Sequence, residues 1–138
     1  MNKEILHKDI TERILKAFFA VYGELGAGFL ESVYRNAMAM ALRDEGLAVT
    51  AEANIEVVFR AQVIGSFRAD LLVDDKVIIE LKAARAMDSA FEAQLLNYLR
   101  ATRCEVGLLL NFGPKPQFKR LVYENSRKDP RSSAFVRG

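Results

Sequence analysis

The sequence predicts an α/β domain in which a mixed central β-sheet is flanked by helices. Apolar residues recur with helical spacing over the first 44 residues and with the extended pattern of strands from Glu52 to Lys82. Helical spacing returns from Asp88 to Thr102 and is followed by an apolar strand, Glu105–Phe112. A helix between two such strands is typical of a crossover connection. All 138 residues, 51% of them hydrophobic, are enough for a single domain with a substantial core.

Two helices are expected at the start of the chain. The first covers Ile5–Val21, and the second runs from about Phe29 to Asp44, where Gly46 ends it. The glycines between them lack the Gly-Lys-Ser/Thr of a phosphate-binding loop and do not follow a strand, so we interpret them as a bend. These glycines are Gly23, Gly26 and Gly28.

The remaining segments are expected to build the sheet and its crossover helix. A tight turn is expected at Asp74-Asp75, and Asp88 is a candidate N-cap of the crossover helix. The last apolar strand should be central, and the strand after it should form an edge. The predicted strands are Glu52–Phe59, Gln62–Ile64, Ser66–Val73, Lys76–Lys82, Glu105–Phe112 and Gln117–Tyr123.

Composition limits the compartment and the class of protein. No apolar run approaches the roughly 20 residues of a membrane span, so no membrane partner is expected. The first residues lack the apolar segment of a signal peptide. Cys104 is the only cysteine, which excludes an internal disulfide or a cysteine-bound cluster within one chain. We therefore expect a cytoplasmic protein, with Cys104 in the core and not a nucleophile.

Positive charge is concentrated near the C-terminus. Residues 112–138 hold seven basic and two acidic residues, a net charge of +5, whereas the whole chain carries +2. A basic tail from about residue 125 could lie along phosphates, and it could equally be a solvated terminus. The basic residues are Lys115, Lys119, Arg120, Arg127, Lys128, Arg131 and Arg137.

The most informative segment is an acidic hairpin. Side chains alternate along a strand, so Glu80 and Lys82 share one face of the third strand while apolar residues surround them. A buried carboxylate and a buried ammonium are costly unless they are paired or bound to a metal. If residues 74–76 form the connection, Val73 pairs with Val77 and Asp70 lies opposite Glu80. A two-residue turn would instead turn the two acids to opposite sides.

Two adjacent carboxylates repel each other unless a cation lies between them. Oxygen ligands of this kind favour Mg²⁺ or Mn²⁺, and the backbone carbonyl of Leu81 could add another ligand. Lys82 would then orient an attacking water and offset negative charge on a phosphodiester. The alternative is a buried ion pair of Lys82 with Glu80 or Asp70, without a metal.

Longer motifs add to this pattern. Asp70…Glu80-Leu-Lys82 resembles the signature of the PD-(D/E)xK nuclease superfamily, and Gly28-Phe-Leu-Glu31-Ser-Val-Tyr34 resembles the motif that names its GxxExxY family. The resemblance to this family extends over the chain from about Ile10 to Leu121. The resemblance implies a restriction-endonuclease-like core.

The resemblance also assigns roles to residues outside the hairpin. It implies that Glu31 joins Asp70 and Glu80 around the metal while Lys82 assists, and that Gln94 and Tyr98 form a Gln-x-x-x-Tyr motif that supports catalysis. Taken alone, Glu31 could face solvent and pair with Arg35. Gln94 and Tyr98 could be the polar boundary of a packed helix.

The sequence therefore predicts a Mg²⁺- or Mn²⁺-dependent nuclease that hydrolyses nucleic acid, and DNA is expected as the substrate more than RNA. Histidine is frequent in the family at the positions of Tyr22 and Phe91. If those histidines contribute to activity, this chain has altered or lost it. The alternative is a weak or inactive nuclease fold that binds nucleic acid or protein, and the composition also permits a homodimer.

Overall fold

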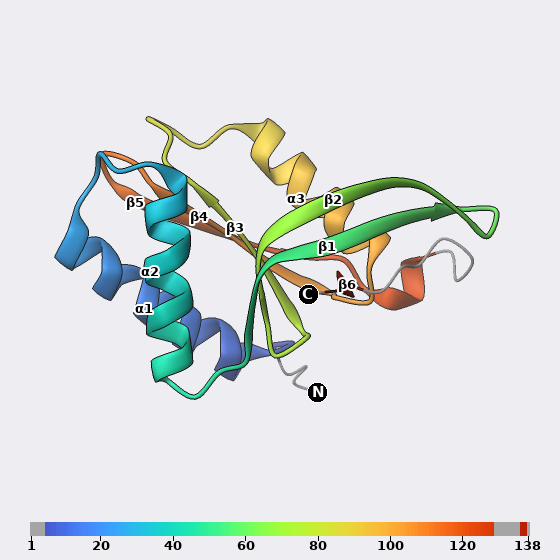
Figure 1. Ribbon diagram of the computed structural model, residues 1–138, viewed down its shortest axis with the longest axis horizontal. Helices are drawn as coiled ribbons and strands as arrows, with labels where there is room; N and C mark the ends of the chain where they lie inside the picture. Colours follow the sequence, from blue (N-terminus) through green and yellow to red (C-terminus); the bar gives the residue numbers. More distant parts are fainter. Residues whose placement is uncertain (1–4, 129–135, 138) are drawn as a thin grey trace.

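The computed structural model describes residues 5–128 and 136–137. Three helices and five long strands make up most of this part of the chain, with a short 3₁₀ helix and a two-residue strand near its end (Figure 1). In chain order the elements are α1 (Lys8–Leu25), α2 (Glu31–Asp44), β1 (Val49–Phe59), β2 (Gln62–Val73), β3 (Val77–Lys82), α3 (Ser89–Ala101), β4 (Val106–Phe112), β5 (Pro116–Val122), η1 (Asn125–Arg127) and β6 (Val136–Arg137).

The strands form one mixed sheet in the order β5-β4-β3-β2-β1-β6. Within the described residues, β3 and β4 form the parallel pair, and every other neighbouring pair is antiparallel. Helix α3 connects β3 to β4, as expected for a crossover between parallel strands. The predicted mixed sheet with flanking helices is confirmed.

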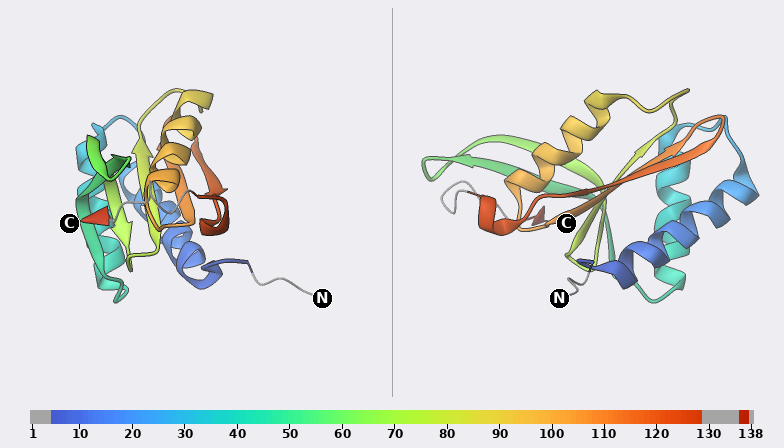
Figure 2. Two further views of the ribbon diagram at one scale, coloured as in Figure 1. Left: turned by 90° about the vertical axis from the view of Figure 1, so that its right-hand side faces the viewer. Right: turned by 180° about the vertical axis from the view of Figure 1, so that it is seen from behind.

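The helices cover the two faces of the sheet (Figure 2). Helices α1 and α2 pack on one face, where the ring of Phe112 stacks on Tyr34 at 4.2 Å between centroids. Helix α3 packs on the other face through Leu95 and Leu99. Gly107 in β4 allows this close approach, because a Cβ there would lie 2.8 Å from a methyl carbon of Leu95.

Burial follows this two-sided arrangement. Strands β3 and β4 are covered on both faces, so the prediction that the apolar strand is central is confirmed. Cys104 is buried, and burial raises the pKa of its thiol to about 11, so the nucleophilic thiolate is disfavoured as expected. None of the described helices combines the length and apolarity needed to cross a bilayer.

Local signals predicted most boundaries. Asp88 caps α3, since its side chain accepts a hydrogen bond from the Ala90 N–H at 2.9 Å. Gly26 and Gly28 bend the chain with φ angles of 67° and 112°. The prediction that Gly23 interrupts the first helix is wrong: α1 continues through it to Leu25, because packing of the helix outweighs the intrinsic cost of one glycine.

The strands also differ from the expectation at two points. Strand β1 begins at Val49, three residues before the predicted Glu52, because Val49–Ala51 already pair with β2. Gln62–Ile64 and Ser66–Val73 are not separate segments, because β2 runs unbroken through Gly65 and pairs with the whole length of β1. The distal parts of β1 and β2 extend beyond the rest of the sheet as a long hairpin (Figure 1). We call residues 53–69 the arm.

Candidate active site

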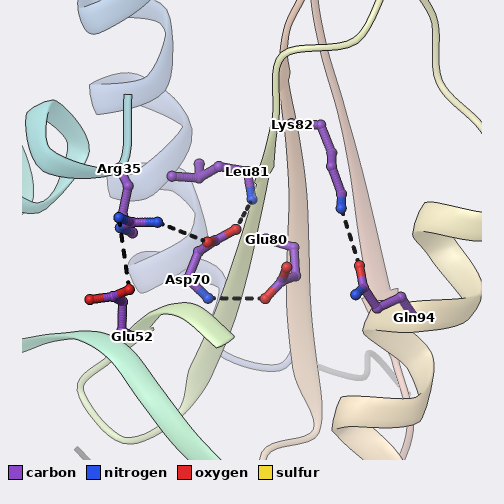
Figure 3. Close-up of polar contacts among 7 residues, drawn as sticks. All are labelled: Arg35, Glu52, Asp70, Glu80, Leu81, Lys82 and Gln94. Atoms are coloured by element: carbon purple, nitrogen blue, oxygen red, sulfur yellow. Dashed lines mark hydrogen bonds and ion pairs between the residues drawn. The ribbon is translucent and has the colours of Figure 1, made fainter. Parts of the chain in front are cut away.

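The two acids of the hairpin lie where β2 and β3 separate. The connection 74–76 has three residues, Val73 pairs with Val77, and the ladder ends at Leu71–Ile79, so the predicted register is confirmed. Beyond that point, side chains replace the ladder bonds (Figure 3). The Leu81 N–H donates to Asp70 Oδ2 at 2.8 Å, and the Asp70 N–H donates to Glu80 Oε1 at 3.0 Å.

A kink in the neighbouring strand accompanies this separation. Glu52, opposite Asp70 in β1, has a φ of 52°, a left-handed conformation that is uncommon for a residue with a side chain. Regular pairing with β2 resumes at Ala53–Ala69. On the arm side of the kink, Ala53 and Ala69 pack beneath α3. On the other side of the kink, Leu71 in β2 faces α1 and α2. Asp70 therefore lies at the base of the arm.

Electrostatics at the pair disfavour two negative charges. Glu80 is only 4% exposed. Burial, and secondarily the charge of Asp70, raise the pKa of Glu80 from 4.5 to about 8, although the Asp70 N–H and the Lys82 charge act in the opposite direction. Without an added cation, Glu80 therefore holds its proton at neutral pH.

Arg35 provides part of the missing positive charge. Its Nη1 lies 3.7 Å from Asp70 Oδ1, and its Nη2 lies 3.9 Å from Glu52 Oε1 (Figure 3). Arg35 comes from α2, on the face of the sheet opposite α3. The sequence suggested Arg35 only as a partner for Glu31, so its contact with the acidic pair was missed.

Glu31 is not brought to the pair. It is the first residue of α2, it is exposed, and within the described residues its side chain has no hydrogen bond or ion pair. The alternative pairing of Glu31 with Arg35 is not present either. Tyr34 is instead buried: its hydroxyl donates to the Gly26 carbonyl at 2.6 Å and accepts from the Phe29 N–H at 3.2 Å, which fixes the bend between α1 and α2.

The other predicted site residues form a chain of contacts toward α3. Lys82 Nζ donates to Gln94 Oε1 at 3.2 Å, and Gln94 Nε2 donates to the Tyr98 hydroxyl at 3.2 Å. Burial, followed by the charges of Glu80 and Asp70, raises the pKa of Tyr98. The ring of Phe91 lies 4.9 Å from Lys82 Nζ, a cation–π distance.

A divalent metal suits the oxygens gathered here. The described part of the chain contains no group of three His, Cys, Asp or Glu side chains arranged to hold a metal ion. Asp70 and Glu80 still offer two hard carboxylates beside the Leu81 backbone, and their repulsion would be relieved by a cation. Mg²⁺ is commonly held by one or two carboxylates plus water and substrate phosphates, so this donor set fits it.

The segment after Lys82 is held by residues that the sequence reasoning did not select. The Asn111 side chain accepts from the Ala84 N–H at 2.9 Å and donates to the Ala84 carbonyl at 3.1 Å. Gly113 leaves room for this contact, since a Cβ there would lie 2.1 Å from the Ala84 oxygen. A fully buried asparagine in an otherwise apolar strand was the available signal.

Several basic residues of the C-terminal segment have partners. Lys119 Nζ lies 2.7 Å from Glu92 Oε1, and Lys128 Nζ donates to the carbonyls of Thr102 and Cys104 at 2.9 and 2.8 Å. Most of the predicted basic tail, including Arg131, lies outside the described residues. Its binding to phosphates stays a prediction.

Comparison with known proteins identifies one family. A model of the PD-(D/E)XK nuclease superfamily matches residues 8–121. A solved structure titled "Crystal structure of SSO0001" matches with 14% sequence identity and a TM-score of 0.47, over 67% of this chain and 50% of that chain, so this chain spans about half the length of that protein. Comparison with curated proteins gives no match.

Proposed function

The chain belongs to the PD-(D/E)XK nuclease superfamily, and from this premise we propose that it hydrolyses phosphodiester bonds of nucleic acid with Mg²⁺ or Mn²⁺. We further place it in the GxxExxY branch, on the motif from Gly28 to Tyr34. The observation that carries the proposal is that the carboxylates of Asp70 and Glu80 lie together where β2 and β3 separate, each accepting a backbone N–H there, with Lys82 two residues after Glu80 on the same strand.

Each residue has a role that follows from its position. Asp70, Glu80 and the Leu81 carbonyl would hold the cation, which supplies Lewis-acid stabilisation of the phosphate charge when bound. Lys82, oriented by Gln94, would position the water that attacks phosphorus and offset negative charge as the bond to the leaving oxygen breaks. Tyr98 holds the amide of Gln94. Glu31 would act through water from the start of α2.

Cleavage of labelled DNA and RNA oligonucleotides with Mg²⁺ or Mn²⁺ tests the proposal. Asp70→Asn keeps an oxygen that can accept the Leu81 N–H, and Lys82→Met keeps the length of the side chain, so both changes should abolish cleavage without unfolding the protein. Lys76→Met removes an exposed lysine from the turn of the same hairpin and should leave cleavage unchanged. Cleavage that survives both site variants would refute the assignment.

A second candidate is a nuclease fold that binds nucleic acid or protein without catalysis. Arg35 beside Asp70, and a Glu80 that keeps its proton, leave the acidic pair partly balanced without a metal. Calorimetric titration with Mn²⁺ at pH 8.5 separates the two candidates. Heat that disappears in Asp70→Asn supports the nuclease, whereas no heat in the unmodified protein supports the binding module.

A further inference from the structure

A groove runs between α3 and the arm, next to the candidate active site. Its volume is about 650 Å³, within the range of small-molecule sites. Helix α3 lies next to the arm in Figure 1 and in the right-hand view of Figure 2, and it contacts β1. The lining residues are Val57, Phe67, Ala90, Ala93, Gln94, Asn97, Tyr98, Arg100 and Ala101.

Small side chains on α3 keep the groove open. Most of its helical lining residues recur at intervals of three and four, so they occupy one face of the helix. Three of them are alanines, Ala90, Ala93 and Ala101, and the amide of Asn97 lies among them. The floor is therefore mainly apolar. Besides the Gln94 amide, which contacts Lys82 and Tyr98, it holds the Asn97 amide, which can both donate and accept hydrogen bonds.

The opposite wall is aromatic. Phe67, on the arm, is 47% exposed, although a large apolar side chain gains free energy from burial. Its ring lies 5.7 Å from that of Tyr98, with 41° between the planes. A flat apolar group entering the groove would cover the Phe67 ring and rest on the alanine floor.

The groove continues into the acidic site through shared residues. Gln94 and Tyr98 line it and also belong to the contact chain that begins at Lys82. Arg100 lies six residues after Gln94, roughly 9 Å along the helix axis. Lys82 contacts Gln94 at the catalytic end of the groove, and Arg100, whose guanidinium also lies 5.9 Å from the Tyr123 ring, lines the groove further along. Two cations spaced in this way complement a phosphate chain.

We infer that this groove takes an unpaired nucleobase of the substrate, so that the enzyme acts on single-stranded nucleic acid. The inference rests on the proposed function, because it assigns the substrate class of that same site. A base can stack on an aromatic ring only when its face is free, and the bases of a duplex already stack on one another. Asn97 would meet the edge of the base, and Arg100 a neighbouring phosphate.

Binding measured without metal tests the inference separately from catalysis. Fluorescence anisotropy in EDTA would compare a labelled 12-nucleotide deoxythymidine strand with its duplex. Phe67→Leu removes the ring but keeps an apolar side chain, and Ala93→Leu fills the groove from an exposed helix position. The matched controls are Phe59→Leu, an exposed phenylalanine at the tip of the arm, and Ala20→Leu, an exposed alanine on α1.

The single strand should bind at least about tenfold more tightly than the duplex. Each groove variant should weaken single-strand binding by roughly tenfold, a typical loss for one stacked base, while both controls stay within about twofold. Equal binding of single strand and duplex, no binding of either, or groove variants that behave like the controls would overturn the inference. Circular dichroism checks that each variant is folded.

Cleavage assays distinguish this inference from the proposed function. If the groove variants cleave single strands with metal as fast as the unmodified protein does, the groove assignment is refuted and the proposed nuclease activity stands. If the groove variants bind single strands more weakly but the unmodified protein cleaves no substrate, the proposed nuclease activity is refuted and the groove assignment stands.

Discussion

Replacing Glu80 by glutamine should remove a pH-dependent loss of stability from the metal-free protein. Burial and the charge of Asp70 raise the pKa of Glu80 from 4.5 to about 8. The folded state therefore binds this proton more tightly than the unfolded chain does. The resulting stabilisation is complete below pH 4.5 and is lost as the pH rises to about 8.

The size of the effect follows from the shift. At 1.36 kcal/mol per pKa unit, ionising Glu80 in the folded protein costs up to roughly 5 kcal/mol of unfolding free energy. Between pH 5.5 and 8.5 the loss attributable to this group is roughly 3 kcal/mol. Glutamine cannot ionise, and its oxygen can still accept the Asp70 N–H, so the variant should keep the stability that the unmodified protein loses.

Urea unfolding followed by circular dichroism in EDTA at pH 5.5, 6.5, 7.5 and 8.5 measures this difference. The stability advantage of Glu80→Gln should grow with pH. With Mn²⁺ in place of EDTA at pH 8.5, the stability of the unmodified protein should recover more than that of the variant. Glu24→Gln, which alters an exposed carboxylate on α1, should follow the unmodified protein at every pH. A stability difference that stays constant from pH 5.5 to 8.5 would refute the electrostatic reasoning.

Three further changes test the surroundings of the site. Arg35→Gln removes the cation beside the acidic hairpin and should strengthen Mn²⁺ binding by roughly two- to fivefold in calorimetry, and weaker binding would mean that Arg35 organises the site instead. Asn111→Ala leaves both backbone groups of Ala84 without their partner and should cost roughly 2–3 kcal/mol in urea unfolding. Gly113→Ala should cost roughly 1–3 kcal/mol because of its clash with the Ala84 oxygen, whereas Gly65→Ala, where a Cβ meets nothing within 4 Å, should cost less than 1 kcal/mol. Equal losses of unfolding free energy for the two glycine variants would contradict the close approach of Gly113 to the Ala84 oxygen.

Much of the architecture could be predicted from the chain because its signals are local. The change from helical to extended spacing, the cap at Asp88 and the three-residue turn each depend on neighbouring residues. The turn fixes the strand register, and the register places Asp70 beside Glu80. The same local spacing placed Gln94 and Tyr98 on one face of a helix.

The rest depends on tertiary contacts that no local pattern records. Arg35 reaches Asp70 from α2, on the face of the sheet opposite α3. Asn111 forms hydrogen bonds with Ala84, 27 residues earlier in the chain. Glu31 shares a helix with Tyr34, but the orientation of α2 leaves Glu31 in solvent and buries Tyr34. The kink at Glu52 carries no glycine, so its left-handed backbone leaves no trace in the sequence.

The separation of β2 from β3 has a consequence for exchange of amide protons with solvent. Most ladder amides are released only when strands part, but those of Asp70 and Leu81 are held by carboxylate oxygens. A rotation of the Glu80 side chain frees the Asp70 amide, and a rotation of the Asp70 side chain frees the Leu81 amide, while the neighbouring strand pairs stay closed. These two amides should therefore exchange faster than those of Leu71 and Ile79, and a cation that draws the carboxylates toward itself should accelerate them further. The protection of two backbone amides thus reports on the charge at the base of the arm.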